Sequence, residues 1–132
     1  MGLRIPFWEH VGMKEAAARP GEGYAEVRLD VTPQVMNPHG VVHGGALATL
    51  VDGSVGAALR TVVDPSAMYS TVELKINYLR PAKGSWLVAK ASLYHRGGRT
   101  AVGKSEIYDE GGTLVAVGMA TYMIFSERTK SG

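Results

Sequence analysis

The sequence contains no cysteine, which excludes disulfides, thiolate catalysis and cysteine-ligated zinc. It has no marked excess of one charge, since the net charge is only +2, so no broad basic face indicates a nucleic acid partner. Its apolar run at 114–125 is shorter than the roughly 20 residues of a membrane helix. The N-terminus lacks the apolar core of a signal peptide. The length predicts a single domain over residues 1–132, and these absences predict a cytoplasmic protein with no membrane partner.

Periodic hydrophobicity predicts one long helix among several strands. The segment His43–Leu59 has no proline and places its leucines and valines at helical spacing. Apolar and polar residues alternate from Tyr24 onward, as in a half-buried strand. Phe7–Met13 predicts a short helical turn, followed by a loop. Four further strands are expected, at roughly 71–78, 87–93, 100–109 and 113–125.

The last four strands are joined by short turns, which require antiparallel pairing. The predicted architecture is therefore α+β: an antiparallel sheet wrapped around one long central helix. The run 113–125 is apolar on both faces, which favours a central, covered strand. Small residues on the helix and on this strand predict a close approach of the two. They are Gly53, Gly56, Ala57, Ala116, Gly118 and Ala120.

The stretch "GRTAVGKS", from Gly98 to Ser105, matches the phosphate-loop pattern G-x-x-x-x-G-K-S/T. A functional phosphate loop is followed by a helix whose N-terminus binds the phosphates. Here "EIYDEGG" leaves no room for that helix, and the next residues are strand formers. The context predicts a hairpin whose sequence matches the motif by coincidence. The interpretation of the chain as an ATPase is therefore rejected.

Asp52 is the only Asp, Glu, Lys or Arg between His43 and Leu59. A carboxylate beside the apolar face of a helix loses hydration, and this costs free energy unless a partner compensates. It is either a structural acid held by a hydrogen bond, or a general base or nucleophile.

The segment "NPHGVVHGG" leads directly into the helix, with Gly44 and Gly45 in the first turn. Free N–H groups at a helix start point outward with the positive end of the helix dipole. Glycine also lets a ligand approach the backbone closely. This pattern outlines an oxyanion hole on the same helix as the buried acid.

The pair His39 and His43 could suggest metal ligands. Only two further histidines, His10 and His95, are present, and no thiol is available. A site needs at least a third placed ligand, so no metal is expected and His43 is interpreted as a neutral donor near the helix start. The sequence has no G-x-S-x-G, so a serine-hydrolase elbow is absent as well.

The motif "NPHGVVHGGALATLVD" resembles the N-x-x-G-x-x-H-G-G-x-x-x-x-L-x-D signature of hotdog-fold acyl-CoA thioesterases of the PaaI-like, phenylacetic-acid-pathway group. "STVELKINYLRPA" is similar to the strand that follows the helix in that family. The resemblance extends from about Tyr24 to Phe125. It implies a hotdog fold whose dimers share a sheet and often pair into tetramers.

The resemblance also implies roles for individual residues. Asp52 matches the nucleophile or general base, and Asn37 the residue that orients water or the thioester carbonyl. The Gly44 amide matches the oxyanion donor, with His43 beside it. Thr71, together with Ser70, matches a hydroxyl that positions water. In the family, Asn37 and Gly44 of one chain face Asp52 of the other.

In the family, the turn resembling "HRGGRTAVGK" lies near the entrance for coenzyme A. Arg96, Arg99 or Lys104, around Gly98, could then meet its phosphates. The alternative is that these are solvated turn charges. Coenzyme A is part of the substrate, and no other cofactor is expected.

The sequence therefore predicts a homo-oligomeric acyl-CoA thioesterase. Two alternatives remain: a non-catalytic hotdog module that binds acyl-CoA, and a hotdog hydratase. The hydratase needs an Asp and His pair that this sequence does not supply in the required arrangement. The acyl group is left open.

Overall fold

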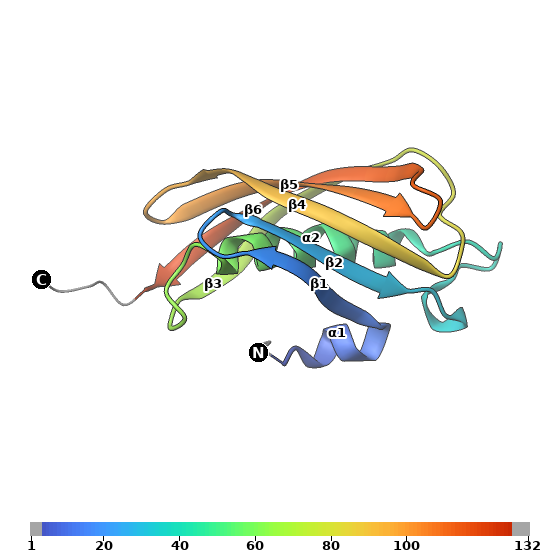
Figure 1. Cartoon of the computed structure of the whole chain (residues 1–132), viewed down its shortest axis with the longest axis horizontal. Coiled ribbons are helices and arrows are strands. Elements are labelled where there is room, and N and C mark those ends of the chain that lie inside the picture. Colours follow the sequence, from blue (N-terminus) through green and yellow to red (C-terminus); the bar gives the residue numbers. More distant parts are fainter. Residues whose placement is uncertain (1–3, 128–132) are drawn as a thin grey trace, which may run out of the picture.

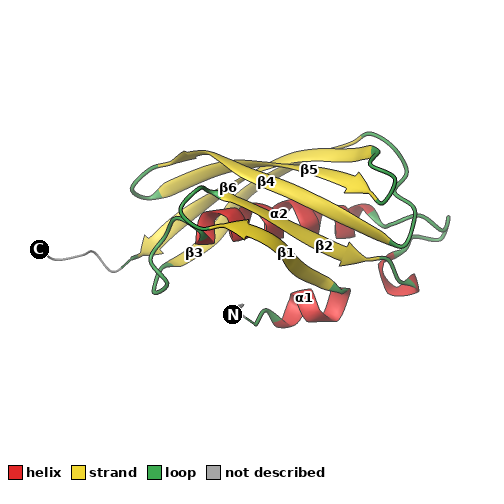
Figure 2. Ribbon diagram, viewed as in Figure 1, coloured by secondary structure: helices red, strands yellow, loops and turns green. Residues whose placement is uncertain are grey.

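One antiparallel sheet of six strands curves around a single long helix in the computed structural model, which describes residues 4–127 (Figures 1 and 2). The strands lie in the order β1-β2-β4-β5-β6-β3, so β1 and β3 form the two edges. The expected hotdog architecture is confirmed. The elements are α1 (Pro6–Val11), β1 (Met13–Arg19), β2 (Tyr24–Asp30), a 3-10 turn (Pro33–Val35), α2 (Gly44–Arg60), β3 (Met68–Tyr78), β4 (Trp86–Arg96), β5 (Thr100–Asp109) and β6 (Leu114–Ser126).

The helix α2 fills the concave side of the sheet because its leucines and valines are buried there. Glycines in the sheet allow it to approach closely. A Cβ on Gly118 of β6 would lie 2.8 Å from Val51, and one on Gly103 of β5 would lie 2.8 Å from Val55. Tight packing of this kind removes apolar surface from water and leaves few voids. The predicted close approach of the helix and the last strand is confirmed.

The hairpin between β4 and β5 contains the phosphate-loop look-alike. Residues 97–99 form its turn, and Lys104 and Ser105 lie within β5 rather than at a helix start. The Ser105 side chain is fully buried and its hydroxyl lies 2.7 Å from that of Ser54 on α2. A hydroxyl held in the core is not available to a magnesium ion or a phosphate. The phosphate-loop interpretation is therefore excluded.

The expectation for the N-terminal segment was wrong in two respects. The helical turn was expected at Phe7–Met13 with a loop after it, but Met13–Arg19 is the edge strand β1. Its letters "MKEAAAR" carry helix formers and no alternation, and pairing with β2 overrides that local preference. The helical turn is shorter than expected because Gly12 ends α1 in the left-handed conformation, at φ 90°.

The strand β6 was expected to be covered on both faces, and only one face is. Its inward residues pack on α2, whereas its outer side exposes Met119, Met123 and Phe125. The strand does lie inside the sheet, between β5 and β3. Among residues 4–127, no helix combines the length and apolar character needed to cross a bilayer.

Candidate active site

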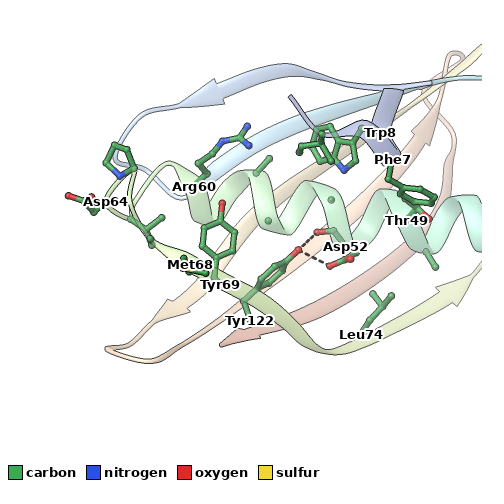
Figure 3. Close-up of a pocket in the computed structure, with 18 residues that line it drawn as sticks. Phe7, Trp8, Thr49, Asp52, Arg60, Asp64, Met68, Tyr69, Leu74 and Tyr122 are labelled. Atoms are coloured by element: carbon green, nitrogen blue, oxygen red, sulfur yellow. Dashed lines mark hydrogen bonds between the residues drawn. The ribbon is translucent and has the colours of Figure 1, made fainter. Parts of the chain in front are cut away.

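Two side chains hold the carboxylate of Asp52, which lies half-buried in the middle of α2. The Thr71 hydroxyl, on β3, donates to Oδ1 over 2.6 Å. The Tyr122 hydroxyl, on β6, lies 2.7 Å from the same Oδ1 and 2.7 Å from the main-chain oxygen of Asp52 (Figure 3). Both donors therefore meet one carboxylate oxygen. Within residues 4–127 no group donates to the other, Oδ2.

The contact of Tyr122 with Asp52 was not predicted from the sequence, because a tyrosine in an apolar strand is typical of a core residue. It is only 6% exposed, and burial raises the pKa of its phenol, with the nearby Asp52 carboxylate adding to the effect. The hydroxyl therefore stays protonated over the ordinary pH range and acts as a donor. The sequence could have predicted only which face of β6 Tyr122 occupies. Alternation along the strand places it on the same face as Ala120 and Ile124, toward α2.

Asp52 lines a cavity of about 920 Å³ that follows the exposed side of α2. Figure 3 shows Trp8 and Phe7 of α1 on one side of the helix and Leu74, Tyr69 and Tyr122 on the other. Arg60 lies toward the far end, beside Tyr69. The walls are mainly apolar side chains and glycines, with polar groups at a few points. A mostly apolar cavity with a carboxylate in its lining is the kind of site in which small molecules bind and react.

The first turn of α2 differs from the expectation at one position. His43 is the N-cap, and its Nδ1 accepts from the Gly45 N–H over 2.8 Å. The Gly45 amide is therefore occupied, and the expectation that it is a free donor was wrong. Because Nδ1 is an acceptor, neutral His43 carries its proton on Nε2 and can donate from there. No acceptor within residues 4–127 takes the Gly44 N–H, which remains available at the positive end of the helix.

Asn37 lies in the loop before α2 and uses its side-chain oxygen locally. Oδ1 accepts from the His39 N–H over 2.9 Å and from the Val41 N–H over 3.4 Å. This arrangement fixes the orientation of the amide and leaves its NH₂ group as the free end. Asn37 can therefore donate to a carbonyl or a water, as the sequence motif predicts.

The single chain does not bring Gly44 and Asp52 together. About 12 Å of helix axis separates them. Gly44 lines a smaller cavity of about 400 Å³, and its carbonyl accepts from the Tyr78 hydroxyl over 2.9 Å. Neither Asn37 nor Gly44 lines the larger cavity that contains Asp52. The two halves of the predicted site are therefore separate within one protomer.

The remaining predicted residues occupy different positions. Ser70 is exposed next to Thr71, on the opposite face of β3, where it does not contact Asp52. Lys104 lies on the outer face of the sheet, over the ring of Tyr94, and thus on the side away from α2.

The turn of the β4–β5 hairpin separates two arginines with different surroundings. Arg96 donates to the Gly97 carbonyl and pairs with Glu127. Arg99 is exposed, as is Gly98 beside it, and no partner within residues 4–127 holds its guanidinium. Arg99 is thus the basic side chain of this turn that is free to bind an anion.

The described part of the chain contains no group of side chains that could hold a metal ion. No cluster of three His, Cys, Asp or Glu side chains occurs within residues 4–127. The pair His39 and His43 does not form one, since the Nδ1 of His43 caps the helix.

Comparison with known proteins gives consistent matches. The sequence profile of the thioesterase superfamily matches residues 39–116. A medium/long-chain acyl-CoA thioesterase of Salmonella typhimurium, YigI, is 26% identical over 91% of this chain and 86% of its own. A 1,4-dihydroxy-2-naphthoyl-CoA hydrolase of Listeria monocytogenes is 27% identical over 97% of this chain and 99% of its own.

Solved structures agree with the sequence matches. A variant of the phenylacetic acid degradation protein PaaI from Thermus thermophilus superposes with a TM-score of 0.79 and 30% identity. The alignment covers 92% of this chain and 100% of that one. The predicted resemblance to the PaaI-like group is confirmed, as is the class of thioester hydrolase. The chain belongs to the thioesterase superfamily.

Proposed function

We propose that the protein hydrolyses the thioester of an acyl-CoA to the free acid and coenzyme A, with Asp52 as the reacting carboxylate. One observation carries the proposal. Asp52 is held through Oδ1 by two hydroxyl donors, while its Oδ2 has no donor within residues 4–127, and the residue lines a cavity large enough for an acyl group. A fixed carboxylate with one free oxygen suits a general base or a nucleophile.

In the general-base route, Asp52 accepts a proton from a water whose oxygen bonds to the thioester carbon. The carbonyl oxygen becomes an oxyanion, which the Gly44 N–H and the Asn37 amide stabilise. The C–S bond then breaks, and the sulfur leaves with the proton held by Asp52. In the alternative route, Asp52 itself attacks, forms an anhydride, releases the thiol and is regenerated by water. Neither route calls for a cofactor besides the coenzyme A of the substrate.

We assign the two halves of each site to two chains, because one chain keeps them apart. The exposed apolar side chains of the edge strand β3 support an interface with a second chain at this edge. Met68, Val72 and Tyr78 are 64%, 53% and 53% exposed. A long, unpaired edge strand that exposes several large apolar side chains is a surface that proteins normally cover. A two-fold pairing at β3 would bring Asn37 and Gly44 of one chain toward Asp52 of the other.

The finer assignments follow the same proposal. Arg99 binds a phosphate of coenzyme A, supported by its exposed and unpaired guanidinium. The dimers pair into a tetramer, supported by the exposed apolar residues on the outer side of β6. The cytoplasm, where acyl-CoA is made and consumed, is the proposed location, and the absence of cysteine is compatible with it.

A thiol-release assay over short, long and aromatic acyl-CoAs tests the proposal. We expect release of free coenzyme A from at least one class, at a rate well above the uncatalysed background. Binding of acyl-CoA without thiol release from any class would instead support the non-catalytic module. ATP serves as a specificity control, and micromolar ATP affinity would contradict the exclusion of the phosphate loop.

A further inference from the structure

We infer that Tyr122 is a positioning residue for the reaction, which it serves by holding Asp52 in the one orientation that keeps Oδ2 free. Its hydroxyl bridges the main-chain oxygen and the Oδ1 of Asp52, each over 2.7 Å. A group that contacts both the backbone and the side chain of one residue restricts the rotation of that side chain. Thr71 adds a second donor to the same oxygen, over 2.6 Å. This inference rests on the proposed function.

The surroundings of Tyr122 hold its own ring in place. The ring meets that of Tyr69 edge to face, with centroids 5.8 Å apart. Opposite the hydroxyl stands Gly56 on α2, where a Cβ would lie only 2.6 Å from the phenolic oxygen. Gly56 is one turn of helix beyond Asp52. The absence of a side chain at this position is therefore what allows the hydroxyl to reach the acid.

The test compares Tyr122→Phe with wild type. The substitution keeps the ring and its contact with Tyr69 but removes the donor. Hydrogen bonds to charged groups are strong enough that kcat should fall by at least about tenfold, with KM within about twofold. A fall in kcat at nearly constant KM is the signature of a misplaced reacting group, because binding of the substrate does not depend on the orientation of Asp52.

Gly56→Ala should reproduce the loss of kcat by displacing the hydroxyl. Gly111→Ala is the matched control, since a Cβ there meets only Asp109 at an ordinary 3.4 Å. Tyr108→Phe, on the outer face, controls for removal of a tyrosine hydroxyl. If Asp52→Asn is inactive while Tyr122→Phe keeps wild-type kcat, the positioning role is wrong and the proposed function stands. If Asp52→Asn is fully active, the proposed mechanism itself fails.

A different observation, the position of α1, carries a second inference: we propose that α1 forms one wall of the acyl subsite and that Trp8 limits how wide an acyl group fits. Ile5, Phe7 and Trp8 all line the cavity that contains Asp52. The Trp8 indole packs on Gly53, where a Cβ would lie 2.8 Å from its ring. Gly53 follows Asp52 directly, so the indole borders the reacting group. This inference also rests on the proposed function.

The expected signature is a change in acyl preference rather than in overall rate. Trp8→Ala should raise the ratio of kcat/KM for naphthoyl-CoA to that for acetyl-CoA by about tenfold, because differences in pocket fit are worth this order of discrimination. Trp86→Ala, on the outer face beside Arg28, is the matched control. If the wild type releases thiol and Trp8→Ala has the same ratio as the wild type, the inference that Trp8 borders the acyl subsite is wrong. If the wild type releases no thiol from any substrate, the proposed function is contradicted instead.

Fluorescence gives a readout that does not depend on turnover. The chain has 2 tryptophans, so Trp86→Phe leaves Trp8 as the sole indole reporter. Combined with Asp52→Asn, this variant should bind octanoyl-CoA without hydrolysing it, and the Trp8 emission should change on titration. Saturable binding with no change in emission would place the acyl chain away from α1 and overturn the inference.

Discussion

The middle and the N-terminal end of α2 present opposite kinds of chemistry. In the middle, Asp52 is held by hydroxyls from β3 and β6 and lies at the wall of a large cavity. At the N-terminal end, His43 and Gly45 are exposed, and the Gly44 N–H has no acceptor within residues 4–127. The acid is held by side chains of its own chain, whereas the Gly44 N–H at the exposed helix end has no such partner among the described residues.

Under the proposed function, this difference means that one helix supplies both parts of a hydrolytic site, although a single chain does not form a complete one. About 12 Å of helix keeps the two apart within a chain. In the proposed dimer, a two-fold partner would bring one copy of each part together, at a distance set by the interface rather than by the helix.

The largest expected effect is on the middle of the helix. Asp52→Asn should lower kcat at least about a hundredfold, the usual range for loss of a general base. Folding should survive, because an amide can still accept from Thr71 and Tyr122, and circular dichroism with thermal unfolding would verify this. Thiol release close to the wild-type rate would remove Asp52 from the mechanism.

The separation of the two regions predicts complementation between chains. Asn37→Ala and Asp52→Ala should each be nearly inactive, and co-refolding should give about half heterodimers by random pairing. Each heterodimer holds one intact site and one doubly altered site, so about a quarter of wild-type activity should return. Verified heterodimers with no more activity than the average of the parents would place both residues in one site of one chain.

A smaller effect is expected at the cap. His43→Ala removes the acceptor for the Gly45 N–H, and loss of an N-cap costs about 1 kcal/mol of stability. His43→Asn keeps a capping oxygen and should recover that stability, as measured by urea denaturation. Activity that recovers together with stability assigns His43 to the helix, while activity lost in both variants assigns its Nε2–H to the substrate.

The smallest effect is expected at the hairpin, outside both regions. Arg99→Ala should raise KM for acyl-CoA several-fold, because it removes one exposed ion contact. An acyl-pantetheine, which lacks the nucleotide phosphates, should show no change. Lys104→Ala, on the outer face, is the matched control. Equal effects on both substrates would show that Arg99 acts through folding.

Much of this fold could be predicted from the sequence because its strands alternate and its long helix has few polar positions. The edge strand β1 could not be predicted, because "KEAAAR" has neither strand-forming residues nor an alternating pattern. Its extended conformation comes from its hydrogen bonds to β2. At the site, the motif letters near the helix start and Asp52 itself were accessible. Tyr122 was not, because its role depends on contacts between β6 and α2 that lie 70 residues apart in the chain.

The hydroxyl pair of Ser54 and Ser105 acts as a check on strand registration. Ser54 donates to the Val51 carbonyl, and the Ser105 hydroxyl supplies the complementary bond inside a dry core. A slip of β5 by one residue would turn Ser105 outward and bring Lys104 or Glu106 against α2. The Ser54 hydroxyl would keep only its bond to the Val51 carbonyl, and a charge would be buried against the helix, which is the larger cost. Ser105, the last residue of the stretch that matches the phosphate-loop pattern, thus helps to disfavour a sheet in which β5 is out of register.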